Sequence, residues 1–149
     1  MKKIFITGGA GYCGSRLVPQ LLDEGYEVTV FDLMIYGSDF FPKKNGKLKI
    51  IKGDIRDQTL LEQSSQNHDI FINLACISND ASFVLNEKLS TAVNLDAFEP
   101  MVTSAKKNGI KRFIYASSSS VYGVSEKKDV TEDHPLVPLT LYNKYKGMC

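Results

Sequence analysis

Residues 3–14 read KIFITGGAGYCG, an apolar β-type run that leads directly into a glycine-rich turn. The glycines fit G-x-G-x-x-G through Gly9, Gly11 and Gly14, and the wider G-x-x-G-x-x-G through Gly8, Gly11 and Gly14. Such a turn lets the backbone approach a pyrophosphate and points the following helix N-terminus at the anion. Turns that bind nothing also use glycine, so the motif gains weight from the strand before it and the helix after it.

An acidic residue follows the next β-type run. Asp32 closes residues 27–31, at the spacing from Gly14 that a dinucleotide-binding motif requires. A carboxylate at that place accepts hydrogen bonds from the adenosine ribose and repels a 2′-phosphate, so it predicts NAD rather than NADP. The alternative is an ordinary turn aspartate. Asp54 follows the third β-type run, where it either faces the adenine edge or caps the next helix.

β-type runs alternate with helical patterns along the chain, and this rhythm is typical of βαβ units. Pro100 lies inside the longest helical pattern and predicts a kink or a break there. The expected strands are residues 3–7, 27–31, 48–51, 70–74 and 111–116. The first expected helix follows the glycine-rich turn, carries an apolar stripe at positions 17, 18, 21 and 22, and ends near Gly25; the others are residues 59–64 and 89–107. The expected loops are residues 37–46 and 126–138. We therefore predict an α/β fold, a Rossmann-type doubly wound parallel sheet with helices on both faces.

Composition excludes several classes of protein. The 149 residues carry 18 basic and 17 acidic side chains, a balance that leaves no electrostatic footprint for nucleic acid or an anionic membrane. No apolar run approaches the roughly 20 residues of a membrane span, and the first residues do not form a signal peptide, so we expect a cytoplasmic protein. The three cysteines and two histidines are widely spaced and predict neither a disulfide framework nor a metal site.

Two further clusters contain candidate catalytic residues. Residues 117–123, SSSSVYG, leave the end of the last expected strand, the rim at which open α/β sheets bind ligands. Tyr142 and Lys146 stand at positions i and i+4, neighbours on one helix face. A phenol has an ordinary pKa near about 10, but the ammonium and an oxidised nicotinamide ring would favour the phenolate. Tyr142 would then take a hydroxyl proton while hydride leaves the same carbon, with Ser118 holding the oxygen.

In this order, the motifs resemble those of the extended short-chain dehydrogenase/reductase superfamily, and within it the NAD-dependent epimerase/dehydratase family that acts on nucleotide sugars. The resemblance implies that Ser118, Tyr142 and Lys146 are catalytic, that Lys146 also binds the nicotinamide ribose, and that Asn94 steadies the sheet near the active site. The implied cofactor-binding residues are Gly8, Gly11, Tyr12, Cys13, Gly14, Asp32, Asp54, Ile55, Leu74, Ala75 and Lys146, and no metal ligand is implied.

The resemblance also indicates which of the family's reactions to expect. In the family's 4,6-dehydratases an Asp-Glu pair follows the catalytic threonine, whereas this chain has Ser119 and Ser120 there, which disfavours dehydration. The expected activity is an NAD-dependent nucleotide-sugar epimerase that oxidises a ring carbon and reduces it again. A dehydrogenase or reductase with net cofactor turnover remains an alternative, as does a non-catalytic NAD-binding protein of the same fold.

Family members continue for about as many residues again, which build a smaller domain that grips the sugar nucleotide. We therefore expect residues 1–149 to form the NAD(P)-binding Rossmann-type domain, as an N-terminal fragment that lacks the substrate domain and does not turn over by itself. The intact protein is expected to be a homodimer, as members of the family usually are.

Overall fold

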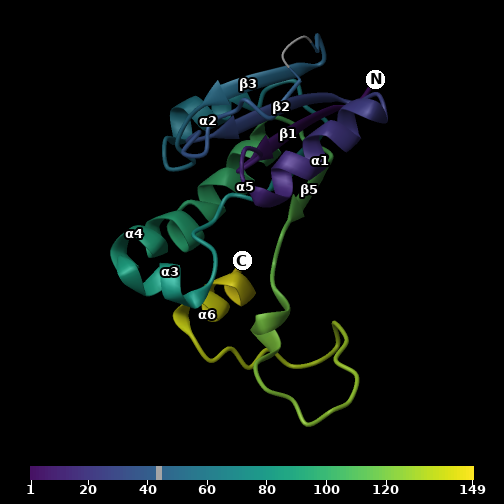
Figure 1. Ribbon diagram of the computed structural model, residues 1–149. Helices are drawn as coiled ribbons and strands as arrows, with labels where there is room; N and C mark the ends of the chain where they lie inside the picture. Colours follow the sequence, from purple (N-terminus) through teal and green to yellow (C-terminus); the bar gives the residue numbers. More distant parts are fainter. Residues whose placement is uncertain (43–44) are drawn as a thin grey trace. The chain divides into compact units, whose positions relative to one another are not determined.

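The computed structural model describes residues 1–42 and 45–149. Its contacts divide the chain into two compact units. The first unit comprises Met1–Ala75 and Glu99–Ala116, and the second comprises Cys76–Phe98 and Ser117–Cys149. The first unit contains the sheet, and the second is built from short helices and loops (Figure 1).

The first unit is organised around one parallel sheet. Its strands are β1 (Lys3–Thr7), β2 (Glu27–Asp32), β3 (Leu48–Lys52), β4 (Ile70–Asn73) and β5 (Arg112–Tyr115), in the order β3-β2-β1-β4-β5. Its helices are α1 (Tyr12–Asp23), α2 (Gln58–Ser64) and α5 (Phe98–Lys107), and α1 and α5 lie on opposite faces of the sheet (Figure 1). The chain reverses direction across the sheet beside β1, where such folds bind ligands. The predicted Rossmann-type fold is confirmed.

The strand β1 is buried on both faces, which explains why it reads as an apolar run without alternation. On one face, Ile4 and Ile6 belong to a core cluster that includes Val18 of α1. On the other face, the Phe5 ring lies 5.0 Å from the ring of Phe71, centroid to centroid. The glycine-rich turn is therefore anchored at the centre of the sheet.

The expected single helix over residues 89–107 is wrong, because the segment is interrupted. That segment divides into α4 (Glu87–Thr91), a π-helical turn η1 (Ala92–Asp96) and α5, and an additional helix, α3 (Asp80–Leu85), precedes it. Asn79 and Asn86 accept hydrogen bonds from Ser82 N and Leu89 N, so each asparagine begins a new helix. Pro100 lies in the first turn of α5, where a missing N–H costs little.

The unit also contains a 3₁₀ turn, η2 (Ser119–Tyr122), and a terminal helix, α6 (Leu141–Met148). Residues 126–138 form a loop, as predicted. The expected loop at 37–46 consists of turns and bends where it is described, and its residues 43–44 lie outside the described part. Within the described residues, no helix is long and apolar enough to cross a membrane.

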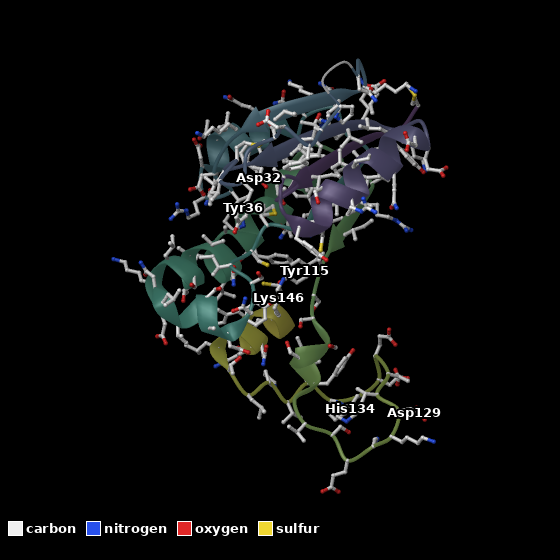
Figure 2. The ribbon with its side chains drawn as sticks, viewed as in Figure 1. Asp32, Tyr36, Tyr115, Asp129, His134 and Lys146 are labelled. Carbon is white, nitrogen blue, oxygen red and sulfur yellow. The ribbon has the colours of Figure 1, made fainter. Side chains whose placement is uncertain are left out.

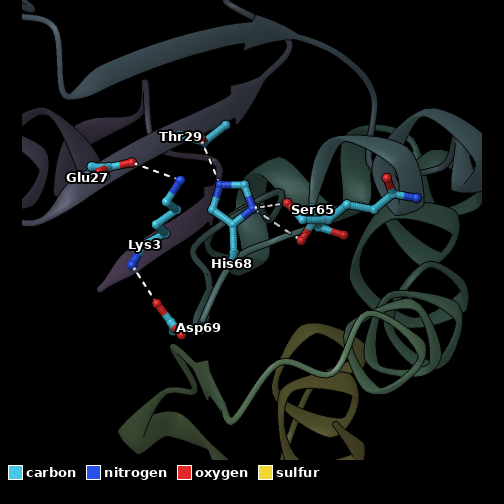
Figure 3. A network of polar contacts seen from close by, with 7 residues as sticks. Lys3, Glu27, Thr29, Ser65, His68 and Asp69 are labelled. Carbon is cyan, nitrogen blue, oxygen red and sulfur yellow. Dashed lines mark hydrogen bonds and ion pairs between the residues drawn. The ribbon is translucent and has the colours of Figure 1, made fainter. Parts of the chain in front are cut away.

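A partly buried polar network lies at the amino-terminal edge of the sheet (Figure 3). His68 Nδ1 lies 2.8 Å from the carbonyl oxygen of Gln66 and 3.1 Å from that of Ser65, so this nitrogen carries the proton. His68 Nε2 then accepts from the Thr29 hydroxyl at 2.9 Å. Burial of the ring lowers the pKa of His68, and the charges of Lys3 and Lys49 lower it further. The folded protein therefore holds His68 neutral.

This network predicts a pH dependence of stability. Because the pKa of His68 is lower in the folded protein, the unfolded chain binds the proton first as the pH falls through about 6.5. The free energy of unfolding should therefore decrease below that pH, by about 1.4 kcal/mol for each unit that separates the two pKa values. Urea titrations at pH 7.5 and 5.0 measure the decrease. His68→Gln should reduce it and His134→Gln should retain it; an equal decrease in all three proteins would contradict the assignment.

Candidate active site

Two glycines of the motif leave no room for a side chain, Gly8 in the loop between β1 and α1 and Gly14 in the first turn of α1. Gly8 has φ +69°, and a Cβ added there would lie 2.5 Å from the backbone nitrogen of Ala75. A Cβ at Gly14 would lie 2.1 Å from the carbonyl oxygen of Gly9. The loop therefore has the tight turn and the close helix packing that the glycine motif predicts, and bare backbone faces any molecule bound against it.

The N-terminus of α1 is open to an anion. Its N-cap is Gly11, which supplies no side-chain hydrogen bond, and no acidic side chain stands in the first turn. The backbone N–H groups of that turn thus lack a side-chain acceptor and carry the positive end of the helix dipole. Tyr12 and Cys13 begin the helix with exposed side chains. A glycine cradle with uncapped N–H groups fits the pyrophosphate of a dinucleotide.

Asp32 lies at the carboxyl end of β2 (Figure 2). Its Oδ2 accepts a hydrogen bond from Ala10 N at 3.0 Å, and its Oδ1 accepts one from Met34 N at 2.8 Å. The carboxylate therefore ties the glycine loop to the end of β2, a function that the sequence analysis did not predict. Each oxygen still has a second lone pair that a ribose hydroxyl can use.

The alternative assignment of Asp54 as a helix cap is wrong. Asp57 is the N-cap of α2 and accepts from Leu60 N at 3.0 Å. Asp54 instead accepts from Arg56 Nε at 2.9 Å, and this side-chain hydrogen bond lowers the pKa of the Asp54 carboxyl. Ile55 between them is buried. Asp54 is thus held, charged, beyond the carboxyl end of β3.

Leu74 and Ala75, expected to line the cofactor, follow β4 directly, and β4 ends at Asn73 rather than at Leu74. Leu74 N donates to Thr7 O at 2.9 Å, and Ala75 N donates to Asn73 Oδ1 at 3.1 Å. The Ala75 backbone fills the space beside Gly8. These two residues therefore lie beside the glycine loop, within the first unit.

In the second unit, α6 carries Tyr142 and Lys146. Thr140 begins the helix by accepting from Asn143 N at 3.2 Å. Lys146 is only 5% exposed, and its Nζ lies 5.9 Å from the centroid of the Tyr142 ring. Figure 2 labels Lys146 on this helix. The helical spacing thus brings the ammonium against the ring, as the pattern predicts.

The surroundings of the Tyr142 phenol shift its pKa. Burial of the phenol raises the pKa of Tyr142, and the neighbouring Cys76 and Asp80 raise it further, while a backbone hydrogen bond from Asn79 acts in the opposite direction. Lys146 Nζ lies 5.9 Å from the centroid of the Tyr142 ring. That the ammonium and an oxidised nicotinamide ring together favour the phenolate stays a prediction. Tyr142 needs further positive charge near its oxygen to act as a base at neutral pH.

Ser118 is connected to α6 through the side chain of Ser120. It is the N-cap of η2, and its Oγ lies 2.7 Å from Ser120 Oγ, which donates to Asn143 Oδ1 at 2.6 Å. Among the described residues, no hydrogen bond joins Ser118 to Tyr142. The sequence analysis missed Ser120 and Asn143 as partners, although each stands beside or near a candidate catalytic residue in the chain.

Asn94 holds the segment that follows β4. It is 6% exposed, its Oδ1 accepts from Ile77 N at 2.8 Å, and its Nδ2 donates to Ile77 O at 2.9 Å. Asn94 belongs to the π-helical turn η1, a distortion that is frequent at functional sites. Within the described residues, no cluster of histidine, cysteine or acidic side chains could hold a metal ion.

Comparison with known proteins places these features in a family. Residues 4–148 match the NAD dependent epimerase/dehydratase family. A putative UDP-arabinose 4-epimerase from Arabidopsis thaliana is 31% identical over 97% of this chain and 35% of its own length. The chain therefore spans between a third and a half of such relatives.

Two solved structures of nucleotide-sugar enzymes are similar to this chain over nearly its whole length. A UDP-N-acetylglucosamine 4-epimerase from Methanobrevibacter ruminantium is 30% identical, with a TM-score of 0.91 over 99% of this chain and 48% of that one. A dTDP-glucose 4,6-dehydratase from Streptomyces venezuelae, crystallised with NAD, is 29% identical, with a TM-score of 0.88 over 97% of this chain and 48% of that one. Because the family's model matches residues 4–148, nearly the whole chain, the chain belongs to the NAD dependent epimerase/dehydratase family.

Proposed function

We propose that this chain is the NAD-binding part of an NAD-dependent nucleotide-sugar 4-epimerase. The observation that carries the proposal is the pairing of Tyr142 with Lys146, an ammonium that is almost fully buried against the tyrosine ring. Burying an ammonium is costly, and NAD binding alone does not require Ser118, Tyr142 and Lys146 together. The relatives named as 4-epimerases supply the substrate class, and their greater length supports sugar-binding residues outside residues 1–149.

Each candidate residue has a role in this proposal. The glycine loop and the start of α1 bind the pyrophosphate, and Asp32 binds the adenosine ribose and selects NAD over NADP. When bound, NAD supplies the acceptor and donor of a hydride at the sugar ring carbon. Tyr142 takes the proton from the hydroxyl on that carbon and returns it, and Ser118 orients the same oxygen by a hydrogen bond.

Two features favour epimerisation over the family's dehydration reaction. Ser119 and Ser120 provide no carboxyl group for the elimination of water, and the Ser120 hydroxyl is engaged with Asn143. A dehydrogenase or reductase with net cofactor turnover is the second candidate, because the same tyrosine and lysine serve both reactions. We further propose that the whole protein is a cytoplasmic homodimer.

The test uses the protein expressed from its complete coding sequence. Incubation with UDP-sugars should interconvert C4 epimers, measured by chromatography, without net growth of the NADH absorbance at 340 nm. Steady growth at 340 nm would assign the protein to the dehydrogenases instead. Absence of any product with a panel of nucleotide sugars, in a protein that still binds NAD, would favour the non-catalytic alternative.

A further inference from the structure

The segment just before α3 adopts a backbone conformation that asparagine rarely uses. Asn79 has φ 66° and ψ 159°, a region occupied almost exclusively by glycine. Such a conformation persists only where the surroundings hold it, at a cost of about 1–3 kcal/mol. The Asn79 side chain accepts from Ser82 N at 2.9 Å, and its carbonyl accepts from Phe83 N at 3.1 Å. These bonds fix the unusual turn onto α3.

Three contacts connect this turn to the helix that carries Tyr142. The Thr140 hydroxyl, on the N-cap of α6, donates to Asp80 Oδ1. The Asn79 backbone lies beside the Tyr142 phenol and acts to lower the pKa of Tyr142. The buried Phe83 ring meets the Tyr142 ring edge-on, with centroids 6.4 Å apart. The turn therefore contacts α6 at its cap, at the phenol and at the ring.

We propose that Asp80, together with the Asn79 backbone, positions Tyr142 for proton transfer. Asp80 is a positioning residue: it holds the first turn of α6 through Thr140, and that turn sets where the phenol oxygen lies. The Asn79 backbone beside this oxygen favours the phenolate. This inference rests on the proposed function, because it assigns Tyr142 as the base of the reaction.

The charges around the phenol indicate how Asp80 also affects titration. The ionisable groups that face Tyr142 are Cys76 before α3, Asp80 on α3, and Lys146 on α6. The Asp80 carboxylate opposes ionisation of the phenol, so the same residue holds the tyrosine in place and raises the pKa of Tyr142. Removing only the charge and removing the whole carboxyl group should therefore have different effects.

The test compares two variants of the protein expressed from its complete coding sequence. Asp80→Ala removes the acceptor for the Thr140 hydroxyl, and misplacement of the phenol should lower kcat by up to about 10²-fold with little change in KM. Asp80→Asn keeps an oxygen for the hydroxyl and removes the charge. It should keep most of kcat and move the acidic limb of the pH profile of kcat to lower pH.

Glu87→Ala is the matched control. Glu87 also stands in the first turn of a short helix of the same unit, and its side chain has no partner among the described residues, so kcat and pH profile should stay unchanged. Circular dichroism checks that each variant folds. An Asp80→Ala variant with normal kcat and KM would overturn the proposal and make Asp80 an ordinary surface residue. A variant in which only KM rises would also overturn it and make Asp80 a substrate contact. If Tyr142→Phe is inactive while both Asp80 variants keep normal activity, this inference fails and the proposed function still holds.

Discussion

Replacing Tyr142 with phenylalanine should lower kcat by about 10²–10⁴-fold, the usual contribution of a positioned acid or base. The substitution removes only the phenol oxygen and keeps the ring that packs on Phe83, so the fold should persist. The glycine loop and Asp32 belong to the first unit, so the affinity for NAD should not change. Steady-state kinetics on the protein from its complete coding sequence and calorimetric titration with NAD measure the two quantities.

Tyr145→Phe provides the control for this substitution. Tyr145 lies on the same helix and also packs edge-on against Phe83, with centroids 5.6 Å apart. It is not one of the residues that match the family's catalytic pattern, so its variant should retain kcat. Equal activity of the Tyr142 and Tyr145 variants would remove Tyr142 from the reaction and favour the non-catalytic alternative.

Gly8→Ala should destabilise the folded protein by about 2–6 kcal/mol and abolish NAD binding. The new Cβ would meet the backbone of Ala75 at 2.5 Å, and backbone cannot move aside as a flexible side chain can. Overpacking of this kind costs about 1–3 kcal/mol, and the positive φ adds a further cost of about 1–3 kcal/mol. Urea denaturation and NAD titration measure the two effects.

Gly25→Ala separates the two causes. Gly25 also has a positive φ, +90°, but nothing lies within 4 Å of a Cβ built there. Its variant should lose only the conformational part of the free energy of unfolding and should bind NAD normally. If both variants lost the same stability and both bound NAD, the close approach between Gly8 and Ala75 would not matter for the site.

The sheet was predictable from the sequence because its signals are local. Each strand is a short β-type run, and the order of strand and helix patterns along the chain specifies a parallel sheet. The glycine loop was predictable for the same reason: Gly8 and Gly14 meet other backbone so closely that no other residue type fits. The acid at the end of β2 followed from its spacing alone.

The second unit was less predictable because its determinants are not local. The apolar pattern over residues 89–107 suggests one helix, but Asn86 caps a new one and a π-turn interrupts it around Asn94. Likewise, the neighbours that raise the pKa of Tyr142, Cys76 and Asp80, are distant in the chain, so only the folded structure brings them to the phenol. The Y-x-x-x-K spacing indicates a lysine beside the tyrosine, but not whether its ammonium lies at the oxygen or over the ring.

The fate of a deuterium on carbon 4 of the substrate tests the central proposal most directly. A UDP-sugar labelled at that carbon is incubated in ordinary water with the protein from its complete coding sequence, and the epimer is examined by mass spectrometry. If Tyr142 moves only the hydroxyl proton and the carbon-bound hydrogen leaves and returns as hydride, the epimer should retain the deuterium. Loss of the label to solvent would show that a base removes the carbon-bound hydrogen as a proton, and would contradict the proposed function.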